Sequence, residues 1–418
     1  MSTESEADLP EDAVLPGTLS EALYAELVAF RRDLHMHPEL GNQEFRTTAA
    51  IKARLEQVGL EPRVLPLGTG LVCDIGVPEA AAPAPTLGSG HTPGSLLALR
   101  ADIDALPIPD TKSECAYRST VPDRAHACGH DVHTTVVLGT GLVLAELHRQ
   151  GLLPRPVRLI FQPAEEVLPG GAADAVESGV LDGVGRIIAV HCDPRVDAGR
   201  IGLRQGAITS ACDRLEVALD GPGGHTARPH LTTDLVTAAA RVAVDVPALV
   251  ARRVDSRGGL AVTWGRIESG HAPNVIPQHA ELSGTVRCLD LAAWRSAPDV
   301  VHAAIDEVAT LHRAKSEITY VRGVPPVVND PAVTELLRDA MIARRGAESV
   351  EGTEQSLGGE DFSWYLEHVP GAMARLGVRP PGERQVRDLH QGDFDVDEYA
   401  IAVGVELFTA AALLDAGR

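Results

Sequence analysis

One short segment of the chain is rich in side chains that bind metals. Between His126 and His133 the sequence places three imidazoles, one thiol and one carboxylate within eight positions, just before an expected helix. Thiolate, imidazole and carboxylate groups are ligands of borderline-soft divalent metals. Gly129, between Cys128 and His130, permits a tight bend that aims both side chains at one centre. The segment predicts a metal site, with a surface cluster of histidines at a helix start as the alternative.

A pair of adjacent carboxylates could supply the acid and base chemistry of such a site. Glu165 and Glu166 follow the apolar run 157–161, and neighbouring side chains in extended backbone point in opposite directions. One carboxylate can then face a metal while the other faces the water that the metal activates. That water needs a base to take its proton, the leaving amine needs an acid, and one glutamate can serve as both in turn. The alternative is two solvated glutamates at a strand end.

Three further histidines are candidate functional residues because of the sequence around them. His191 follows the apolar run 186–190, and His390 lies near the C-terminus. His225 lies in a loop with three glycines, which would let the backbone approach another group closely. Taken alone, each is more often an ordinary loop or turn residue than a functional one.

Buried strands are expected to position several of these residues. Apolar runs at residues 96–100, 157–161 and 187–190 each lead into carboxylates or a histidine, and a helical pattern covers residues 131–149. Alternation of strands and helices predicts an α/β sheet with parallel strands. In such sheets the ligand site lies beyond the carboxyl ends of the strands. The candidates should therefore meet at one edge of the sheet.

The middle of the chain shows a different order of elements. The pattern predicts strand 214–219, helix 233–253, strands 260–267 and 280–288, helix 297–312 and strand 317–321. This β-α-β-β-α-β order is that of a ferredoxin-like unit. Ser296 as cap and Pro298 in the first turn would start its second helix. The unit, residues 213–322, is expected to be inserted in a larger domain formed by residues 18–212 and 323–418.

Composition narrows the class of protein. The 418 residues include 37 Lys and Arg against 58 Asp and Glu, a formal charge of -21 that repels nucleic acid and anionic membrane surfaces. The length favours two domains. Six scattered cysteines without a CxxC pair fit a reducing cytoplasm. Residues 1–17 are acidic and lack the features of a secretory leader, and no apolar run is long enough to span a membrane. We expect a cytoplasmic protein with a flexible N-terminal tail.

Taken together, these motifs resemble those of the zinc-peptidase-like amidohydrolases, which include aminoacylases, hippurate hydrolases and plant auxin-conjugate hydrolases. The resemblance extends from about Leu34 to Glu398. The matching pieces occur in the family's order, and they are LHMHPEL from Leu34, LRADIDALP from Leu99, the Cys128 segment, PAEE from Pro163, His191, the His225 loop, NVIP from Asn274, GEDF from Gly359, and Leu389-His390. Gln391-Gly392-Asp393 and the Pro-rich stretch 78–93 depart from the family's pattern.

The resemblance implies a zinc-peptidase-like catalytic domain with a ferredoxin-like lid or dimerisation domain, and a centre with two divalent metal ions. The ligands would be Cys128 as a bridging thiolate with His130, Glu166, His191 and His390. The ligand types suit Zn, Mn, Co or Ni.

The resemblance also implies roles for four residues near the metals. Glu165 would be the general base and acid, and Asp104 would orient the metal ligands. His225 would stabilise the oxyanion in the active site of a second subunit, and Asn274 would contact the polar end of the substrate. The implied partner is a second copy of the chain, bound through the inserted domain.

The implied activity is metal-dependent hydrolysis of an N-acyl amino acid or a similar small amide. A dipeptidase or carboxypeptidase on the same fold is the alternative within enzymes. A binding protein with a single structural metal is the alternative outside them, but structural sites are usually closed by four protein ligands and need no spare base. Glu165 beside a two-metal ligand set argues against a structural site.

Overall fold

The computed structural model describes residues 17–77 and 94–415. The expected tail (residues 1–17) falls almost entirely outside this part of the chain, as does the whole Pro-rich stretch 78–93. Among the described residues, no helix is both long and apolar enough to span a membrane.

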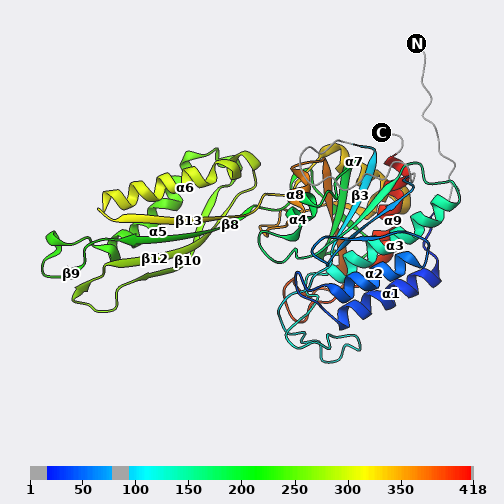
Figure 1. The fold of residues 1–418 in the computed structure, drawn as a ribbon, viewed down its shortest axis with the longest axis horizontal. Coiled ribbons are helices and arrows are strands. Elements are labelled where there is room, and N and C mark those ends of the chain that lie inside the picture. The colour runs from blue at the N-terminus through cyan, green and yellow to red at the C-terminus, as the bar shows by residue number, and fades with distance from the viewer. Residues whose placement is uncertain (1–16, 78–93, 416–418) are drawn as a thin grey trace, which may run out of the picture.

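The larger part of the molecule is built on one mixed eight-stranded sheet (Figure 1). In spatial order its strands are β1 (Arg63–Val64), β2 (Leu71–Ile75), β4 (Val157–Gln162), β3 (Leu96–Asp102), β5 (Val184–Asp197), β16 (Gly371–Arg379), β6 (Ile201–Leu203) and β15 (Val350–Gly352). The central strands β4, β3, β5 and β16 run parallel to one another. The predicted α/β architecture with parallel strands is confirmed.

Helices cover both faces of this sheet, which explains why its central strands are mainly apolar and buried. One face carries α1 (Glu21–Met36), α2 (Phe45–Glu56), α3 (His130–Arg149), α7 (Pro331–Arg345) and α9 (Tyr399–Leu414), and the other carries the short helices α4 (Gly171–Glu177) and α8 (Ser363–Leu366). Along β3, Leu97 and Leu99 pack toward the first group, whereas Leu96 and Ala98 pack toward the second. This alternation follows from the pleat of a strand.

A second unit projects from the main sheet and has its own core (Figure 1). It comprises β8 (Cys212–Asp220), α5 (Leu235–Arg253), β10 (Ala261–Ser269), β12 (His279–Arg287), α6 (Leu291–Leu311) and β13 (Lys315–Val324). The strands form an antiparallel sheet in the order β10-β12-β8-β13. We call residues 212–324 the inserted unit, because strands of the main sheet precede and follow it in the chain.

Two small strand pairs and three 3₁₀ turns complete the described structure. The pairs are β9 (Gly224–His225) with β11 (Val275–Ile276), and β7 (Gly206–Ala207) with β14 (Val328–Asn329). The 3₁₀ turns are Pro229–Leu231, Ser256–Gly258 and Ala347–Ser349.

The predicted start of the second helix in the inserted unit is wrong. α6 begins at Leu291, and its cap is Asp290, whose carboxylate accepts a hydrogen bond from the Ala293 N–H at 2.8 Å. Ser296 and Pro298 lie inside the helix. A proline there leaves the carbonyl four residues earlier without its helical donor. Arg322 of β13 replaces that donor, because its Nη1 donates to the Trp294 carbonyl at 2.9 Å.

Two local predictions near the site are also wrong. β5 extends to Asp197, so His191 lies within the strand and does not end it. The pairing of β5 with β3 nevertheless ends at Ala189, which pairs with Arg100. His191 therefore lies just beyond the part of β5 that pairs with β3. Glu165 and Glu166 lie in a turn, not in extended backbone. The turn follows Ala164, which has a left-handed conformation with φ 57°.

Candidate metal centre

The five predicted metal ligands come together at the carboxyl end of the central strands. Cys128 Sγ lies 3.6 Å from His191 Nε2, and His390 Nε2 lies 3.2 Å from Glu166 Oε1. His130 Nε2 lies 3.9 Å from the same Glu166 oxygen. The five residues come from four segments of the chain, so only the tertiary fold can assemble them.

The turn before α3 aims Cys128 and His130 at this centre. Gly129 is the N-cap of α3 and has φ 86°, a left-handed conformation that glycine adopts without strain. A Cβ atom on Gly129 would lie 2.7 Å from Cys192 Sγ, so a larger residue would also collide there. The bend inferred from Gly129 is therefore present, and it needs glycine for two reasons.

Hydrogen bonds fix which nitrogen of each imidazole faces the centre. His130 Nδ1 lies 3.2 Å from Asp104 Oδ1, and His191 Nδ1 donates to the Cys192 carbonyl at 2.8 Å. Because carboxylate and carbonyl oxygens accept hydrogen bonds, both Nδ1 atoms carry a proton, so Nε2 is the nitrogen of each neutral imidazole that a metal would bind. Asp104 Oδ2 also accepts from the Glu166 N–H at 3.0 Å. Asp104 thus holds two of the candidate ligands, the geometry expected of an orienting residue.

The donor set fits divalent metal ions. His130 Nε2 is buried and has no hydrogen-bond partner among the described residues, which is costly for a polar atom unless a ligand contacts it. Burial, followed by the charges of Glu166 and Glu165, raises the pKa of the Cys128 thiol. A bound cation would act in the opposite direction, because positive charge favours the thiolate.

His133 does not belong to the ligand set. Its Nδ1 lies 2.6 Å from Asp102 Oδ1, and its Nε2 accepts a hydrogen bond from the Cys192 N–H at 2.8 Å. With both ring nitrogens engaged, no lone pair remains for a metal. His133 and Asp102 instead tie α3 to β3 and β5.

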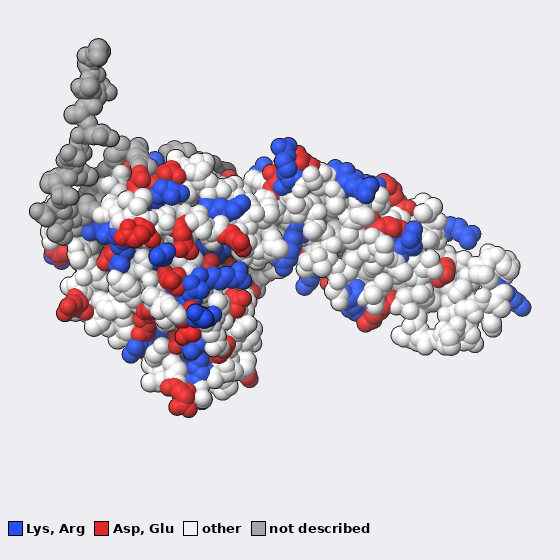
Figure 2. All heavy atoms as spheres, turned by 180° about the vertical axis from the view of Figure 1, so that it is seen from behind, with Lys and Arg blue, Asp and Glu red and all other residues white. Residues whose placement is uncertain are grey.

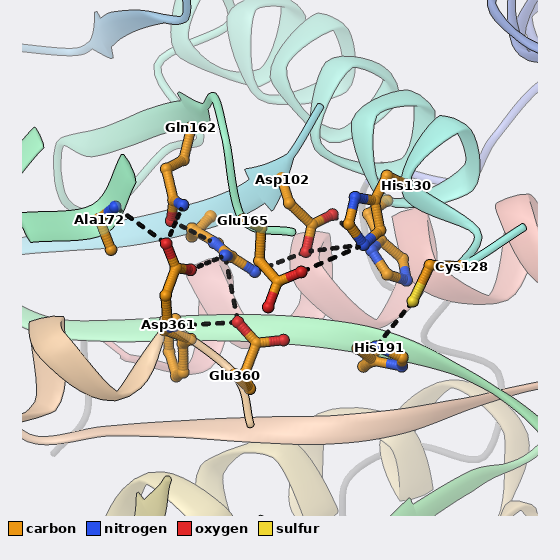
Figure 3. Close-up of polar contacts among 12 residues, drawn as sticks. Asp102, Cys128, His130, Gln162, Glu165, Ala172, His191, Glu360 and Asp361 are labelled. Carbon is orange, nitrogen blue, oxygen red and sulfur yellow. Dashed lines mark hydrogen bonds and ion pairs between the residues drawn. The ribbon is translucent and has the colours of Figure 1, made fainter. Parts of the chain in front are cut away.

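Glu165 lies beside the candidate ligands and within a cluster of carboxylates (Figure 3). Its Oε2 is 3.8 Å from His130 Nε2, and carboxylate oxygens of Glu165, Glu360 and Asp361 lie within 4.8 Å of one another. Burial and then the charges of Glu360, Glu166 and Asp361 raise the pKa of Glu165. A cation at the neighbouring ligands would lower it again, because it favours the carboxylate.

A buried arginine holds this carboxylate cluster in place. Arg100 lies 2.7 Å from both Asp102 Oδ2 and Asp361 Oδ1, and 3.1 Å from Glu360 Oε1. Burial raises the pKa of Asp361 to about 8, with Glu360 adding to the effect against the opposing charge of Arg100. No role was predicted for Arg100, Glu360 or Asp361, although the GEDF motif contains the two carboxylates. The available signal for Arg100 was an arginine directly after the apolar residues 96–99 of a predicted buried strand.

A cavity of about 360 Å³ opens onto these residues and is here called the first cavity. Its lining includes Cys128, Glu165, Glu166, His191, His390, Arg287, Arg375 and residues 358–361. His225 and Asn274 do not line it. His225 is part of β9 and Asn274 directly precedes β11, at the end of the inserted unit away from the main sheet, where the Thr226 N–H donates to the Asn274 carbonyl at 3.2 Å (Figure 1). Within one chain the structure does not bring these two residues to the centre.

Comparison with known proteins places the chain in a family. The model of peptidase family M20/M25/M40 matches residues 98–414. The chain belongs to this family. An N-acetyl-L-cysteine deacetylase of Bacillus subtilis is 37% identical over 91% of this chain and 85% of its own length. A solved B. subtilis structure, described as a dinuclear metal binding peptidase of family M20, is 33% identical with a TM-score of 0.79 and covers 96% of this chain and 99% of its own.

Another relative is matched over only part of its own length. A Rhodococcus jostii protein named putative glutamate–cysteine ligase is 45% identical over 93% of this chain, but the match spans 47% of that protein. Its name therefore describes a protein of which this chain matches less than half.

The resemblance drawn from the motifs is confirmed, and membership of the M20 family identifies the chain as a hydrolase of amide bonds that uses bound metal.

Proposed function

We propose that this M20 family chain releases an amino acid from an N-acyl amino acid, using a pair of divalent ions held by Cys128, His130, Glu166, His191 and His390. The observation that carries the proposal is the meeting of five metal-type donors with a sixth group, the Glu165 carboxylate, in one cavity. A structural metal needs no such spare carboxylate. Zn, Mn, Co and Ni all suit this donor set.

The metal ions and the protein side chains would have separate roles in the reaction. Bound divalent ions would polarise the scissile carbonyl and make the attacking water more acidic. The Glu165 carboxylate takes the proton of that water and returns it to the amine nitrogen as the C–N bond breaks, so one group serves as base and then as acid. Asp104 keeps His130 and Glu166 in the orientation that ligation needs.

His225 and Asn274 would act in the cavity of a second subunit. Both lie far from their own centre, and His225 is exposed. Brought in by a partner, an imidazole could donate a hydrogen bond to the oxyanion that develops on the carbonyl. Asn274 would contact the polar end of the substrate.

A homodimer through the inserted unit would provide this arrangement. The β-α-β-β-α-β order of the unit supports a ferredoxin-like lid domain. Exposed apolar side chains on or near α5, namely Leu231, Val236 and Val244, offer a surface that a partner could cover. Figure 2 shows few charged side chains at the far end of the unit on the face in view. We further propose a cytoplasmic location, which six free cysteines support.

The test is hydrolysis of a panel of N-acyl amino acids and dipeptides, with metal content measured on the same samples. We expect turnover of N-acyl amino acids, loss of activity with a chelator and recovery on adding metal. Glu165→Gln should keep its metal while kcat falls about 10²- to 10⁴-fold. A change of the exposed Glu56 to Gln controls for the loss of a charge.

Two outcomes would contradict the proposal. Full activity in metal-depleted protein would remove the metals from the mechanism. Turnover of dipeptides alone would replace an amidohydrolase with a dipeptidase on the same site.

A further inference from the structure

Arg375 is a buried cation that the mechanism above does not use. It lies in β16, in the middle of the main sheet, and is 6% exposed. Its guanidinium makes no hydrogen bond or ion pair with any described residue, and its Nη2 is fully enclosed. A buried charge without a partner is strongly unfavourable, so such a group in a binding site is expected to meet an anion when the site is filled.

Arg375 stands between the metal centre and a second cavity. It pairs in register with His191 across the parallel strands β16 and β5, so the two side chains lie on the same face of the sheet. It lines the first cavity and also a neighbouring cavity of about 490 Å³, here called the second cavity. Ser356 and Leu389 are the other residues that line both. A ligand that extends from the metal ligands into the second cavity must pass Arg375.

The acidic groups of the second cavity are engaged elsewhere or exposed. Asp193 Oδ1 accepts from the Arg195 N–H at 2.8 Å, and Asp388 Oδ2 lies 3.6 Å from Arg195 Nη2. Glu351 pairs with an arginine outside the cavity, and Glu354 is exposed to solvent. None of these carboxylates forms an ion pair with Arg375. The charges of Asp193 and Glu360 act on Arg375 from a distance, but no described carboxylate forms an ion pair with it, so the guanidinium remains available to a ligand.

The first cavity has a separate cation that could take the α-carboxylate of an amino acid. Arg287 of β12 lines the first cavity but not the second, and it donates one hydrogen bond, from Nη1 to the Leu357 carbonyl. A guanidinium group has five N–H donors, so most of the donors of Arg287 remain free to bind a carboxylate. Two cations on different walls, one from the inserted unit and one from the main sheet, match a ligand with two anionic groups.

We propose that Arg375 binds a second carboxylate of the substrate, in addition to the α-carboxylate, and so selects dicarboxylic N-acyl amino acids. This inference rests on the proposed function. The second carboxylate can come from the acyl chain or from the amino-acid side chain, since both would extend beyond the metal ligands. The planar guanidinium suits a carboxylate because two parallel N–H bonds can form.

The test compares two pairs of substrates that differ by one charge. N-succinyl-L-leucine against N-butyryl-L-leucine places the extra carboxylate on the acyl chain, and N-acetyl-L-glutamate against N-acetyl-L-glutamine places it on the side chain. We expect wild type to prefer the charged member of one pair. Arg375→Met should lower kcat/KM for that substrate about 10- to 100-fold, mainly through KM, and change the neutral member less than about threefold.

Two further variants distinguish binding from a structural role. Arg375→Lys keeps the charge but loses the fork, so it should recover part of the preference. Arg149→Met removes an exposed cation at the end of α3, outside the lining of both cavities, and should leave the preference unchanged. Metal content of all variants is measured, because Arg375 neighbours His191. An Arg375→Met protein that loses metal, or loses both members of a pair equally, would show that the residue supports the centre and would overturn the proposal.

A binding measurement keeps the inference separate from the proposed activity. Calorimetry on metal-loaded Glu165→Gln protein, with the same four compounds, needs no turnover. Tighter binding of a charged compound, lost on adding Arg375→Met, supports the anion site even if the reaction is of another kind. Equal binding within both pairs would overturn the anion site even if N-acyl amino acids are substrates.

Discussion

At the scale of single residues, the site depends on groups that hold the ligands as much as on the ligands themselves. Asp104 is the clearest case, since one carboxylate contacts the proton-bearing nitrogen of His130 and the backbone N–H of Glu166. Such partners fix the orientation and raise the basicity of metal ligands.

Replacing Asp104 by Asn should therefore weaken metal binding. The amide keeps the shape but loses the charge, and its NH₂ group cannot accept a hydrogen bond. We expect the dissociation constant for the metal to rise about 10- to 100-fold, measured by competition with a coloured chelator. Asp330→Asn, at the cap of α7, is a control carboxylate remote from the cavity. Unchanged affinity in the Asp104 variant would contradict an orienting role.

Glu44 should make stability depend on pH. It is fully buried, its Oε1 accepts from the Ala164 N–H at 2.8 Å, and burial, aided by the charge of Asp104, raises the pKa of Glu44 to about 7. Because this value lies above that of the unfolded chain, the associated stability is fully present below about pH 4.5 and is lost as pH rises through about 7. The loss is roughly 3 kcal/mol, at about 1.4 kcal/mol per pKa unit.

The measurement is urea unfolding of wild type and Glu44→Gln at several pH values. The variant cannot ionise, so we expect the free energy of unfolding of wild type, relative to the variant, to fall between pH 4.5 and pH 7.5. A difference that stays constant over this range would mean that Glu44 is not protonated in the folded protein.

At the scale of elements, α6 shows how one strand can correct a defect in a neighbouring helix. Pro298 removes a helical donor, and Arg322 of β13 supplies donors to the Trp294 and Arg295 carbonyls at 2.9 and 2.8 Å. Its guanidinium also lies 4.1 Å from the centre of the Trp294 ring. The helix and the strand therefore depend on each other.

Arg322→Met should destabilise the protein by roughly 1–3 kcal/mol, because the two carbonyls lose charged donors. Urea unfolding followed by circular dichroism measures the change. Arg295→Met, in α6, removes a surface ion pair with Glu367 at the end of α8 and should cost less than about 1 kcal/mol. Equal effects of the two changes would remove the special role of Arg322.

At the scale of the whole molecule, the proposed dimer requires that each active site draw on two chains. Glu165 lies at the centre, whereas His225 lies at the far end of the inserted unit (Figure 1). If His225 acts in the partner's cavity, a dimer of one Glu165→Gln subunit and one His225→Asn subunit has one intact site and one doubly defective site.

Mixing the two inactive variants should therefore restore activity. With random pairing of equal amounts, half of the dimers are mixed and half of their sites are intact, so we expect about a quarter of wild-type activity. The mixture is made by co-expression, and its dimeric state is checked by sedimentation. Each variant assayed alone is the control. A dimeric mixture that stays inactive would place His225 outside the partner's site.

The sequence alone determined the chemistry and the general architecture, because both can be inferred from patterns of residues close together in the chain. The spacing of Cys128, Gly129 and His130 predicts a metal-binding turn, and apolar runs that lead into polar residues predict a parallel sheet with its site at one edge. The order of motifs was specific enough to indicate the family, and the match to residues 98–414 confirms it.

Only the tertiary structure decided which groups meet and which remain unpaired. It brought the five candidate ligands together from separate segments and placed a hydrogen-bond partner at both ring nitrogens of His133. It placed the start of α6 before Pro298, because Arg322 donates to the Trp294 carbonyl that the proline leaves without its helical donor, and it enclosed Arg375 without a partner. These outcomes depend on contacts between residues far apart in the chain, where hydrogen bonding and burial outweigh the local preferences that a sequence pattern records.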